Sequence, residues 1–458
     1  MFPLLWQYKD EVKTMAQAFF GGVHPNDMKA ATNEKAIEQL QAPAQVVIPM
    51  SMHFGAPCTP TVSKGDYVKL GQKIGEFKGL GAPIHASVSG TVAAVEPRPY
   101  SMGGKVMSVV IDNDFKDDLS EEVHAPADPD ALSVEEMVEM VKQAGIVGMG
   151  GATFPTHTKI SSGIGKVDTV IINGAECEPY ITSDDRLMRE TPERVVGGLR
   201  VVLQILQPKR AAIGIEQNKP EAIAAISAVL GSGIDLLPLH VRYPQGAEKQ
   251  LIQTVTGRCV PPGGLPAHVG CAVFNAATCA AIYDAVYLGL PLVRRAVTVT
   301  GSAIAKPGNF LAPIGTAYSD LVEAAGGFAL PPYKVLCGGP MMGIAQYTLR
   351  TATIKGNNAL TCYSDKDRHE TPNPHCIRCG KCVEACPMHL MPLFLHRAVN
   401  RGDLERLDEL HVMDCIECGS CAYGCPAGIP LVQSFRTGKK LVRDAAAREK
   451  AKKEAAAK

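Results

Sequence analysis

The sequence predicts a multidomain protein of mixed α/β and α+β class that ends in a small cysteine-rich module. Three observations support this class. At about 150 residues per domain, 458 residues suggest roughly three domains. Strand-like and helix-like segments alternate through the middle of the chain, which is typical of a parallel sheet covered by helices. Eight of the fifteen cysteines fall in two equally spaced runs within the last hundred residues.

The composition excludes several classes of function. Lys plus Arg and Asp plus Glu both total 46, so the chain lacks the broad positive field that nucleic-acid binding needs. It has no run of 18 apolar residues and no basic-apolar-small leader, and we expect it to be neither membrane-spanning nor secreted. The cysteine spacing indicates metal binding in a reducing compartment rather than disulfides.

The first part of the chain divides at about residue 40. Residues 1–40 form an N-terminal extension without a clear period, for which we predict no function. Residues 41–115 contain short strands separated by turn residues, which predicts a small all-β module. The phrases KGDYVKLGQKIG and SVSGTV resemble the barrel-sandwich hybrid fold of biotinyl and lipoyl carriers. No lysine lies between Gly79 and Gly104, so we interpret the module as structural or docking, with a carrier as the alternative.

Two further units follow an acidic, proline-containing linker. Ser133 and Glu136 have the spacing of a helix capping box, which predicts a helix start. Residues 130–294 then alternate strands and helices, as in a Rossmann-like α/β domain. Residues 295–348 have the pattern of two strands, a helix and a strand, a compact α+β unit that resembles the β-grasp domains called SLBB.

Residues 365–435 carry the strongest chemical signal, the spacing C-x2-C-x2-C-x3-C-P in two copies. Three thiolates in one tight turn can each take a corner of a [4Fe-4S] cubane, and in two-cluster ferredoxins the fourth cysteine ligates the other cluster. Zinc, the alternative, prefers paired C-x2-C knuckles and has no use for a third cysteine and a trailing proline. The predicted ligands are Cys376, Cys379, Cys382 and Cys425 for the first cluster, and Cys415, Cys418, Cys421 and Cys386 for the second.

The remaining cysteines share no such spacing, and we expect them to be small buried core residues. Residues 436–458 form a basic, alanine-rich tail with nine Lys or Arg and three acids. This composition predicts a solvated helix, and contact with an anionic membrane surface or an acidic partner is the alternative.

A possible ligand site lies in the α/β domain. The loop that begins GMGGAT at Gly148 exposes backbone N–H groups, and Lys159 follows closely, a combination that suits a phosphate, although a glycine loop can also be a simple turn. Asn173 ends a predicted strand and is followed by GAECEPY, which puts Glu176 and Glu178 at the carboxyl edge of the sheet. Ligands in such folds bind at that edge.

The segments GMGGATFPTHTK, NGAECEPY, YPQGAEK and FNAAT together resemble the flavin-bearing, NADH-oxidising subunit of respiratory complex I. The resemblance implies two sets of site residues. Those that would hold FMN are Gly148, Gly150, Gly151, Lys159, Asn173, Tyr243, Gly246, Asn275 and Thr278. Those that would shape the NADH site are Phe154, Glu176, Glu178 and Glu248. Ala175 departs from the complex I pattern, in which an Asp contacts the flavin.

The order of the four units resembles the RnfC family of the Rnf electron-transport complex. This resemblance implies an NADH-linked oxidoreductase subunit with FMN, two [4Fe-4S] clusters and NAD(H) as substrate, in which no protein acid or base is needed for hydride transfer. It further implies peripheral docking on the cytoplasmic side of the cell (inner) membrane, other Rnf subunits as partners, ferredoxin as the ultimate redox partner, and coupled ion translocation.

Two alternatives to this function remain open. A soluble NADH-dependent flavin and iron–sulfur reductase, of the cobalamin reductase or diaphorase type, shares the flavin and cluster modules. A non-catalytic ferredoxin-like electron wire would use the α/β domain only as a scaffold. An NADH site joined to one-electron clusters needs a flavin between them, and NADH-dependent bleaching of flavin absorbance would exclude the wire.

Overall fold

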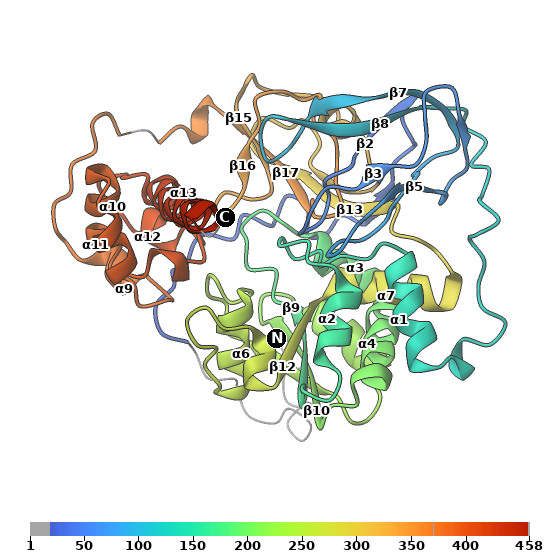
Figure 1. Cartoon of the computed structure of the whole chain (residues 1–458), viewed down its shortest axis with the longest axis horizontal. Coiled ribbons are helices and arrows are strands. Elements are labelled where there is room, and N and C mark those ends of the chain that lie inside the picture. Colours follow the sequence, from blue (N-terminus) through green and yellow to red (C-terminus); the bar gives the residue numbers. More distant parts are fainter. Residues whose placement is uncertain (1–18, 370, 457–458) are drawn as a thin grey trace, which may run out of the picture.

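The computed structural model describes residues 19–369 and 371–456 and contains the four expected folded parts (Figure 1). The barrel and the β-grasp unit lie together in one layer, the α/β domain lies below them, and the helical cysteine-rich module stands to one side. Of the N-terminal extension, residues 1–18 lie outside the described residues. Residues 370, 457 and 458 lie outside them as well.

The barrel domain consists of two small sheets, with strand orders β2-β8-β7-β4 and β3-β5-β6. Inward-facing residues of β2 and β8 are fully buried and pair across the strands, as Val46 does with Ile111 and Ile48 with Val109. The strands are β2 (Gln45–Pro49), β3 (Thr59–Pro60), β4 (Tyr67–Val68), β5 (Lys73–Glu76), β6 (Ile84–His85), β7 (Gly90–Pro99) and β8 (Lys105–Asn113). The prediction of a small all-β module is confirmed.

The α/β domain is built on a four-stranded parallel sheet of order β11-β10-β9-β12. Its strands are β9 (Thr169–Gly174), β10 (Arg210–Glu216), β11 (Asp235–Leu239) and β12 (Cys271–Asn275). Its helices are α1 (Val134–Gln143), α2 (Thr156–Gly163), α3 (Ser183–Glu190), α4 (Pro192–Leu206), α5 (Pro220–Val229), α6 (Glu248–Thr256) and α7 (Ala276–Leu288). The capping box of Ser133 and Glu136 is present at the start of α1.

Both faces of this sheet are covered. Helices α1, α4 and α7 pack together over one face, and their core is continuous with that of the barrel domain. Helix α6 covers the other face through Leu251 and Ile252, which pack on Ile171 of β9. Strand β9 therefore lies at the centre of the sheet, with β10 on one side and the later strand β12 on the other.

The β-grasp unit forms a six-stranded sheet of order β1-β14-β13-β17-β15-β16. Its strands are β1 (Ile37–Gln39), β13 (Arg294–Thr300), β14 (Gly308–Pro313), β15 (Pro332–Cys337), β16 (Ile344–Ala345) and β17 (Ala359–Ser364), and its helix is α8 (Tyr318–Ala324). Strands β1 and β17 come from outside residues 295–348. The N-terminal extension thus adds a parallel edge strand beside β14.

The cysteine-rich module is helical. Leu395, Leu407, Val412 and Phe435 form its core. Its helices are α9 (Lys381–Glu384), α10 (Pro392–Arg401), α11 (Leu404–Glu409), α12 (Ser420–Tyr423) and α13 (Leu431–Ala456), and short 3-10 turns occur at η1 (Pro129–Ala131), η2 (Pro266–Val269), η3 (Asp365–Asp367) and η4 (Val412–Asp414). The predicted tail is the continuation of α13, which begins within the module. Among the described residues, no helix is both long and apolar enough to cross a bilayer.

Candidate functional site

The strand order of the α/β sheet reverses at β9, because the chain adds β10 and β11 on one side of it and then β12 on the other. Open parallel sheets bind ligands at such a switch point, here between β9 and β12. Asn173 and Asn275 are register partners at the carboxyl ends of these two neighbouring strands. Asn275 also caps α7, because its Oδ1 accepts hydrogen bonds from the N–H groups of Ala277 and Thr278. Two of the predicted FMN residues therefore meet at the expected edge.

The glycine loop lies against the start of α7. The Gly148 N–H donates to the Phe154 carbonyl at 2.9 Å, which closes the loop, and the Met149 N–H donates to Thr278 Oγ1 at 2.9 Å, which ties it to α7. Gly150 lies beside Asn275. At Gly151 (φ +121°) an added Cβ would meet nothing within 4 Å. The loop presents open backbone beside the start of a helix, an arrangement that suits an anion.

Lys159 projects from α2 toward the same edge. Its Nζ donates to Glu248 Oε1 at 2.7 Å and to the Val273 carbonyl at 2.6 Å. It also lies 5.5 Å from the centre of the Phe274 ring. Glu248 begins α6, so the predicted phosphate residue and one predicted NADH residue form an ion pair across the sheet edge.

Gly246 completes this edge from the loop before α6. Asn173 Nδ2 donates to the Gly246 carbonyl at 2.7 Å, and the Gly246 N–H donates to Cys177 Sγ at 3.3 Å. A Cβ at Gly246 would lie 3.5 Å from the Cβ of Ala175, the residue that departs from the complex I pattern. Ala175 is fully buried, so position 175 contributes packing and a carbonyl, which accepts from Lys219 Nζ at 2.7 Å.

Glu176 is a buried carboxylate that accepts hydrogen bonds from backbone N–H groups at the start of α3. It accepts the N–H groups of Asp184 at 2.6 Å and Asp185 at 3.2 Å, and lies 3.9 Å from Lys29 Nζ. Burial raises the pKa of Glu176 to about 7, and the Lys29 ammonium opposes that rise. The structure thus gives Glu176 internal partners rather than a free carboxylate at the ligand edge.

Glu178 is also buried and joins the α/β domain to the β-grasp unit. It accepts the N–H groups of Met341 at 2.6 Å and Met342 at 3.1 Å. Burial raises its pKa, and these N–H donors and the Tyr243 hydroxyl oppose the rise. Tyr243, a predicted FMN residue, is itself buried and donates its hydroxyl to the Cys418 carbonyl at 2.6 Å. Tyr243 therefore links the flavin-side loop directly to the second cysteine motif.

The two cysteine motifs fold alike. In the first, the Arg378 N–H donates to Cys376 Sγ at 3.4 Å, and in the second the Glu417 N–H donates to Cys415 Sγ at 3.4 Å. Arg378 and Glu417, one residue before the second cysteine of each motif, both have left-handed backbone angles (φ 58° and 56°). Backbone N–H groups aimed at sulfur stabilise thiolate ligands.

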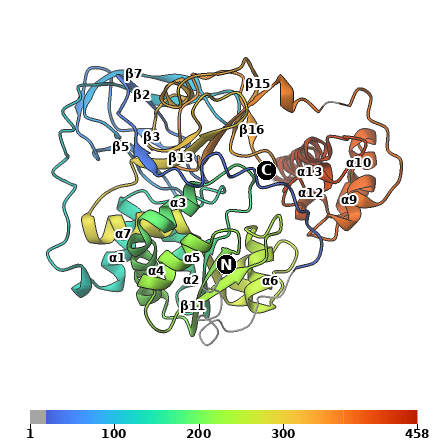
Figure 2. The same ribbon diagram turned by 180° about the vertical axis from the view of Figure 1, so that it is seen from behind.

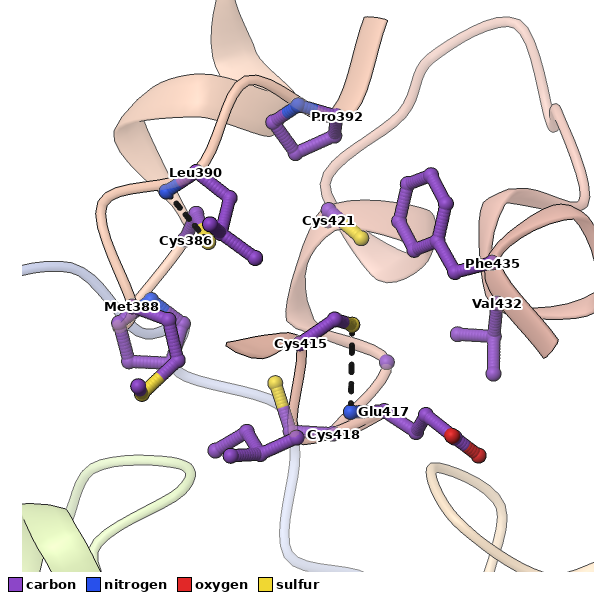
Figure 3. A pocket seen from close by; sticks show the side chains of 13 residues that line it. Cys386, Met388, Leu390, Pro392, Cys415, Glu417, Cys418, Cys421, Val432 and Phe435 are labelled. Atoms are coloured by element: carbon purple, nitrogen blue, oxygen red, sulfur yellow. Dashed lines mark hydrogen bonds between the residues drawn. The ribbon is translucent and has the colours of Figure 1, made fainter. Parts of the chain in front are cut away.

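The fourth cysteine of the first motif lies with the second motif. Cys386, Cys415, Cys418 and Cys421 line one cavity and surround a common space (Figure 3). The Leu390 N–H donates to Cys386 Sγ at 3.3 Å, and Phe435 closes the apolar wall. This is the set predicted for the second cluster. Cys382 and Cys425, assigned to the first cluster with Cys376 and Cys379, are both half-buried.

The second motif lies against the α/β domain, and the first faces outward. Besides the Tyr243 bond, Gln250 Nε2 of α6 donates at 3.1 Å to the carbonyl of Pro387, which follows Cys386 and lines the same cavity as the second motif. Cys418 and Cys421 are buried, whereas Cys376 and Cys379 are exposed. The cavity of the second motif therefore lies between the ligand edge of the sheet and the exposed first motif.

The sequence reasoning missed one element of the site, the segment from Phe19 to β1. It runs along the cysteine module and between the two layers of the molecule (Figure 2). The Gly22 N–H donates to the Ala385 carbonyl at 3.0 Å, and Val23 pairs with Tyr243. Further on, the buried Lys29 Nζ donates to the carbonyls of Glu176 at 3.0 Å, Glu178 at 3.1 Å and Ile181. The pattern FFGG followed by His-Pro was its only sequence signal.

The residues present fit FMN and two [4Fe-4S] clusters. Gly151 leaves open space on the glycine loop beside the start of α7, and Lys159 reaches the same sheet edge, which together suit a flavin phosphate. Behind the glycine loop, Asp184 Oδ1 and Arg295 Nε are buried without a partner among the described residues. Eight cysteines, with N–H donors aimed at three of their sulfurs, supply the donor set for two cubanes. The fold and site define an electron-transfer protein of the flavin and iron–sulfur class.

Comparisons with known proteins agree with this class. Four family models match successive segments: "RnfC Barrel sandwich hybrid domain" (residues 17–116), "Nuo51 FMN-binding domain" (141–284), "SLBB domain" (296–345) and "4Fe-4S dicluster domain" (375–429). The predicted fold class, a barrel-sandwich hybrid, an FMN-binding α/β domain, an SLBB domain and a two-cluster ferredoxin-like domain, is confirmed. FMN and two [4Fe-4S] clusters are its cofactors, as predicted.

Full-length relatives give the family. The chain is 46% identical over 443 residues to a subunit of the "Proton-translocating ferredoxin:NAD(+) oxidoreductase complex" of Clostridium ljungdahlii, covering 96% of this chain and 97% of that protein. It is 45% identical to the counterpart in the "Na(+)-translocating" complex of Acetobacterium woodii, covering 92% and 96%. It is 42% identical to the counterpart in the "Ion-translocating oxidoreductase complex" of Rhodobacter capsulatus, covering 92% and 82%. The chain belongs to this family, RnfC.

Proposed function

We propose that this chain is the NADH- and FMN-binding subunit of an ion-translocating ferredoxin:NAD+ oxidoreductase. In this role it exchanges a hydride between NADH and FMN and relays single electrons through two clusters to or from membrane partners. The observation that carries the proposal is the contact of the two halves of the site. Tyr243, from the loop beside the flavin edge, donates its hydroxyl to the carbonyl of Cys418 at 2.6 Å.

The cofactors supply the redox chemistry, since a flavin exchanges hydride with NADH and single electrons with iron–sulfur clusters. The chain supplies binding and position. The N–H groups of the glycine loop and Lys159 would hold the phosphate. Asn173, Gly246 and Asn275 would frame the flavin at the carboxyl ends of β9 and β12. Glu176 and Glu178 would support this edge without contacting the ligand, because their carboxylates already accept N–H groups of the chain.

The order of the clusters follows from burial. The cluster held by Cys415, Cys418, Cys421 and Cys386 would take electrons first, because Tyr243 bonds to Cys418 and Gln250 of α6 bonds to Pro387, next to Cys386. The cluster held by Cys376, Cys379, Cys382 and Cys425 would exchange them with the partner, because its first two cysteines are exposed. The buried Phe435 and Val432 help to exclude water from the cavity lined by Cys415, Cys418, Cys421 and Cys386.

The proposal also covers where the chain is located in the cell and which partners it binds. Its relatives are named as subunits of ion-translocating complexes, one of them proton-translocating and one Na+-translocating. We infer that this chain docks peripherally on the cytoplasmic side of the cell membrane, with the exposed first motif toward its redox partner. The alternative, a soluble flavin and iron–sulfur reductase, would carry the same cofactors without membrane partners.

One preparation tests these points. The full chain, purified anaerobically, should hold about eight iron and about eight sulfide per chain, and NADH should bleach its flavin before electron paramagnetic resonance detects reduced clusters. Flavin that NADH does not bleach would contradict the catalytic role and favour a non-catalytic electron wire. Chain that never copurifies with membranes of its own organism would instead favour the soluble reductase.

A further inference from the structure

One side chain outside the α/β domain reaches the glycine loop. Phe54 lies in the barrel segment between β2 and β3, and 59% of its surface is exposed. Its N–H donates to the carbonyl of Thr153, within the glycine loop, at 2.9 Å. Its ring lies 5.9 Å from the ring of Phe154, with an angle of 35° between the two planes. The barrel and the α/β domain therefore build an aromatic pair directly beside the proposed cofactor site.

The backbone around Phe54 fixes this position. A Cβ on Gly55 (φ +122°) would lie 2.1 Å from the Leu80 carbonyl oxygen, so only glycine lets the segment follow the neighbouring turn. On the other side, a Cβ on Gly356 would lie 2.6 Å from Thr153 Cγ2. Thr153 itself has a left-handed backbone (φ 48°). Close backbone approaches from two other parts of the chain thus hold the end of the glycine loop and present Phe54 to it.

The glycine loop that carries Thr153 is open at Gly151. Gly151, two residues before Thr153, has nothing within 4 Å of the position of an added Cβ. A single exposed phenylalanine is common on protein surfaces and needs no explanation. Here the exposed Phe54 ring lies beside the Phe154 ring. The backbone N–H of Phe54 is bonded to the glycine loop, which has the features of a phosphate site. Flat heteroaromatic rings stack on such side chains.

We propose that Phe54, together with Phe154, binds a planar ring of the nicotinamide dinucleotide, so that the barrel domain contributes a wall of the NADH site. This inference rests on the proposed function, because it assigns the dinucleotide of that same reaction to the open side of the loop. The barrel is then part of the substrate site as well as a structural module.

The test uses the full, anaerobically purified chain with its flavin. Phe54→Ala should raise the NADH concentration at half-maximal flavin bleaching by about tenfold, the size expected for loss of one stacked ring, while the flavin content stays at the wild-type level. Calorimetric titration with NAD+ should give the same loss without any turnover. Phe54→Tyr, which keeps the ring, should behave like the wild type. Phe115→Ala removes the matched exposed phenylalanine of the barrel, 58% exposed, and should change nothing.

Reduced nicotinamide mononucleotide, which lacks adenine, identifies the ring. Weakened NADH with unchanged mononucleotide would support stacking of adenine, and weakening of both would support stacking of nicotinamide. Unchanged binding of both by Phe54→Ala, or loss of flavin from that variant, would overturn the inference. Wild-type protein whose flavin NADH does not bleach would instead overturn the proposed function, so the two failures are distinguishable.

Discussion

Replacing Lys29 by Met should destabilise the flavin domain strongly, although Lys29 lies in the N-terminal extension. Its ammonium is buried and donates to the carbonyls of Glu176, Glu178 and Ile181. It also lies 3.9 Å from the Glu176 carboxylate. Met has a similar length and fills the same space, so the substitution removes the charge and the donors and little packing.

The magnitude follows from these contacts. A buried acceptor left without a donor costs about 1–3 kcal/mol, and loss of one partner of a buried ion pair costs about 3–5 kcal/mol. The two costs overlap at Lys29, so we expect a loss of about 4 kcal/mol. At about 2–4 °C per kcal/mol for a domain of this size, the midpoint of thermal unfolding should fall by about 10 °C.

The pH dependence adds a signature. The Lys29 ammonium opposes the rise in the pKa of Glu176, so its removal raises that pKa further. A carboxyl whose folded pKa is raised loses stability as pH increases through that pKa, because the folded state binds more protons than the unfolded state. Since the pKa of Glu176 is already about 7 in the wild type and rises further in the variant, the deficit of Lys29→Met should be larger at pH 8 than at pH 6.

The assay is thermal unfolding of the holo-protein, followed by flavin release and by far-ultraviolet circular dichroism. Lys35→Met is the matched control, since Lys35 lies in the same segment, is exposed, and donates to the Pro307 carbonyl at 2.6 Å. It should change the free energy of unfolding by at most about 0.5 kcal/mol. Equal shifts for both variants, or a deficit that shrinks as pH rises, would contradict a stabilising role for the buried Lys29 ammonium.

Three further predictions concern the cofactors and the domain junction. Cys386→Ala should lower iron from about eight to about four per chain and erase the electron paramagnetic resonance signal that Cys415→Ala erases; loss of the Cys376→Ala signal would favour local ligation. Lys159→Ala should weaken FMN binding by about tenfold, the value of one charge-assisted hydrogen bond, and full flavin occupancy after dialysis would argue for a phosphate elsewhere. At the junction of the barrel and α/β domains, the buried Lys355 Nζ donates to the carbonyls of Pro83 at 2.7 Å and Gly145 at 2.6 Å. Burial lowers the pKa of Lys355 from 10.5 to about 7, so its contribution to stability should rise between pH 7 and pH 10. Thermal melts of Lys355→Met should lack that rise, and an identical pH slope would contradict it.

The sequence predicted the parts of the molecule whose signals are local. The two cysteine runs and their glycines define their own turns, and the strand-to-helix alternation defines the parallel sheet. The position of Cys386 beside the second motif was predictable because the spacing puts the fourth cysteine beyond the turn. That Asn173 and Asn275 meet was predictable as well, because the carboxyl ends of parallel strands lie at one edge of a sheet.

The parts that escaped prediction depend on contacts between residues far apart in the chain. Strand β1 has only three residues, two of them exposed and polar, so no hydrophobic period identifies it. Nothing near Phe54 in the sequence indicates that its N–H reaches Thr153. Glu176 and Glu178 were predicted to shape the NADH site, but residue type alone does not tell whether a carboxylate faces a ligand or accepts backbone N–H groups. These assignments stay predictions, and the observed hydrogen bonds favour indirect roles.

The segment from Phe19 to β1 explains how the cysteine module is held at a fixed distance from the flavin edge. Electron transfer between cofactors requires such a fixed distance, and close backbone approaches help to set it. A Cβ on Gly22 would lie 2.5 Å from the Tyr243 carbonyl oxygen, and a Cβ on Gly419 would lie 2.7 Å from that of Met341. A side chain at Gly22 would push the N-terminal segment from Tyr243, and one at Gly419 would push the second motif from Met341. Because the Tyr243 hydroxyl bond to Cys418 spans only 2.6 Å, a shift of one ångström would break it. The geometry of the electron path therefore depends on two glycines that hold no cofactor.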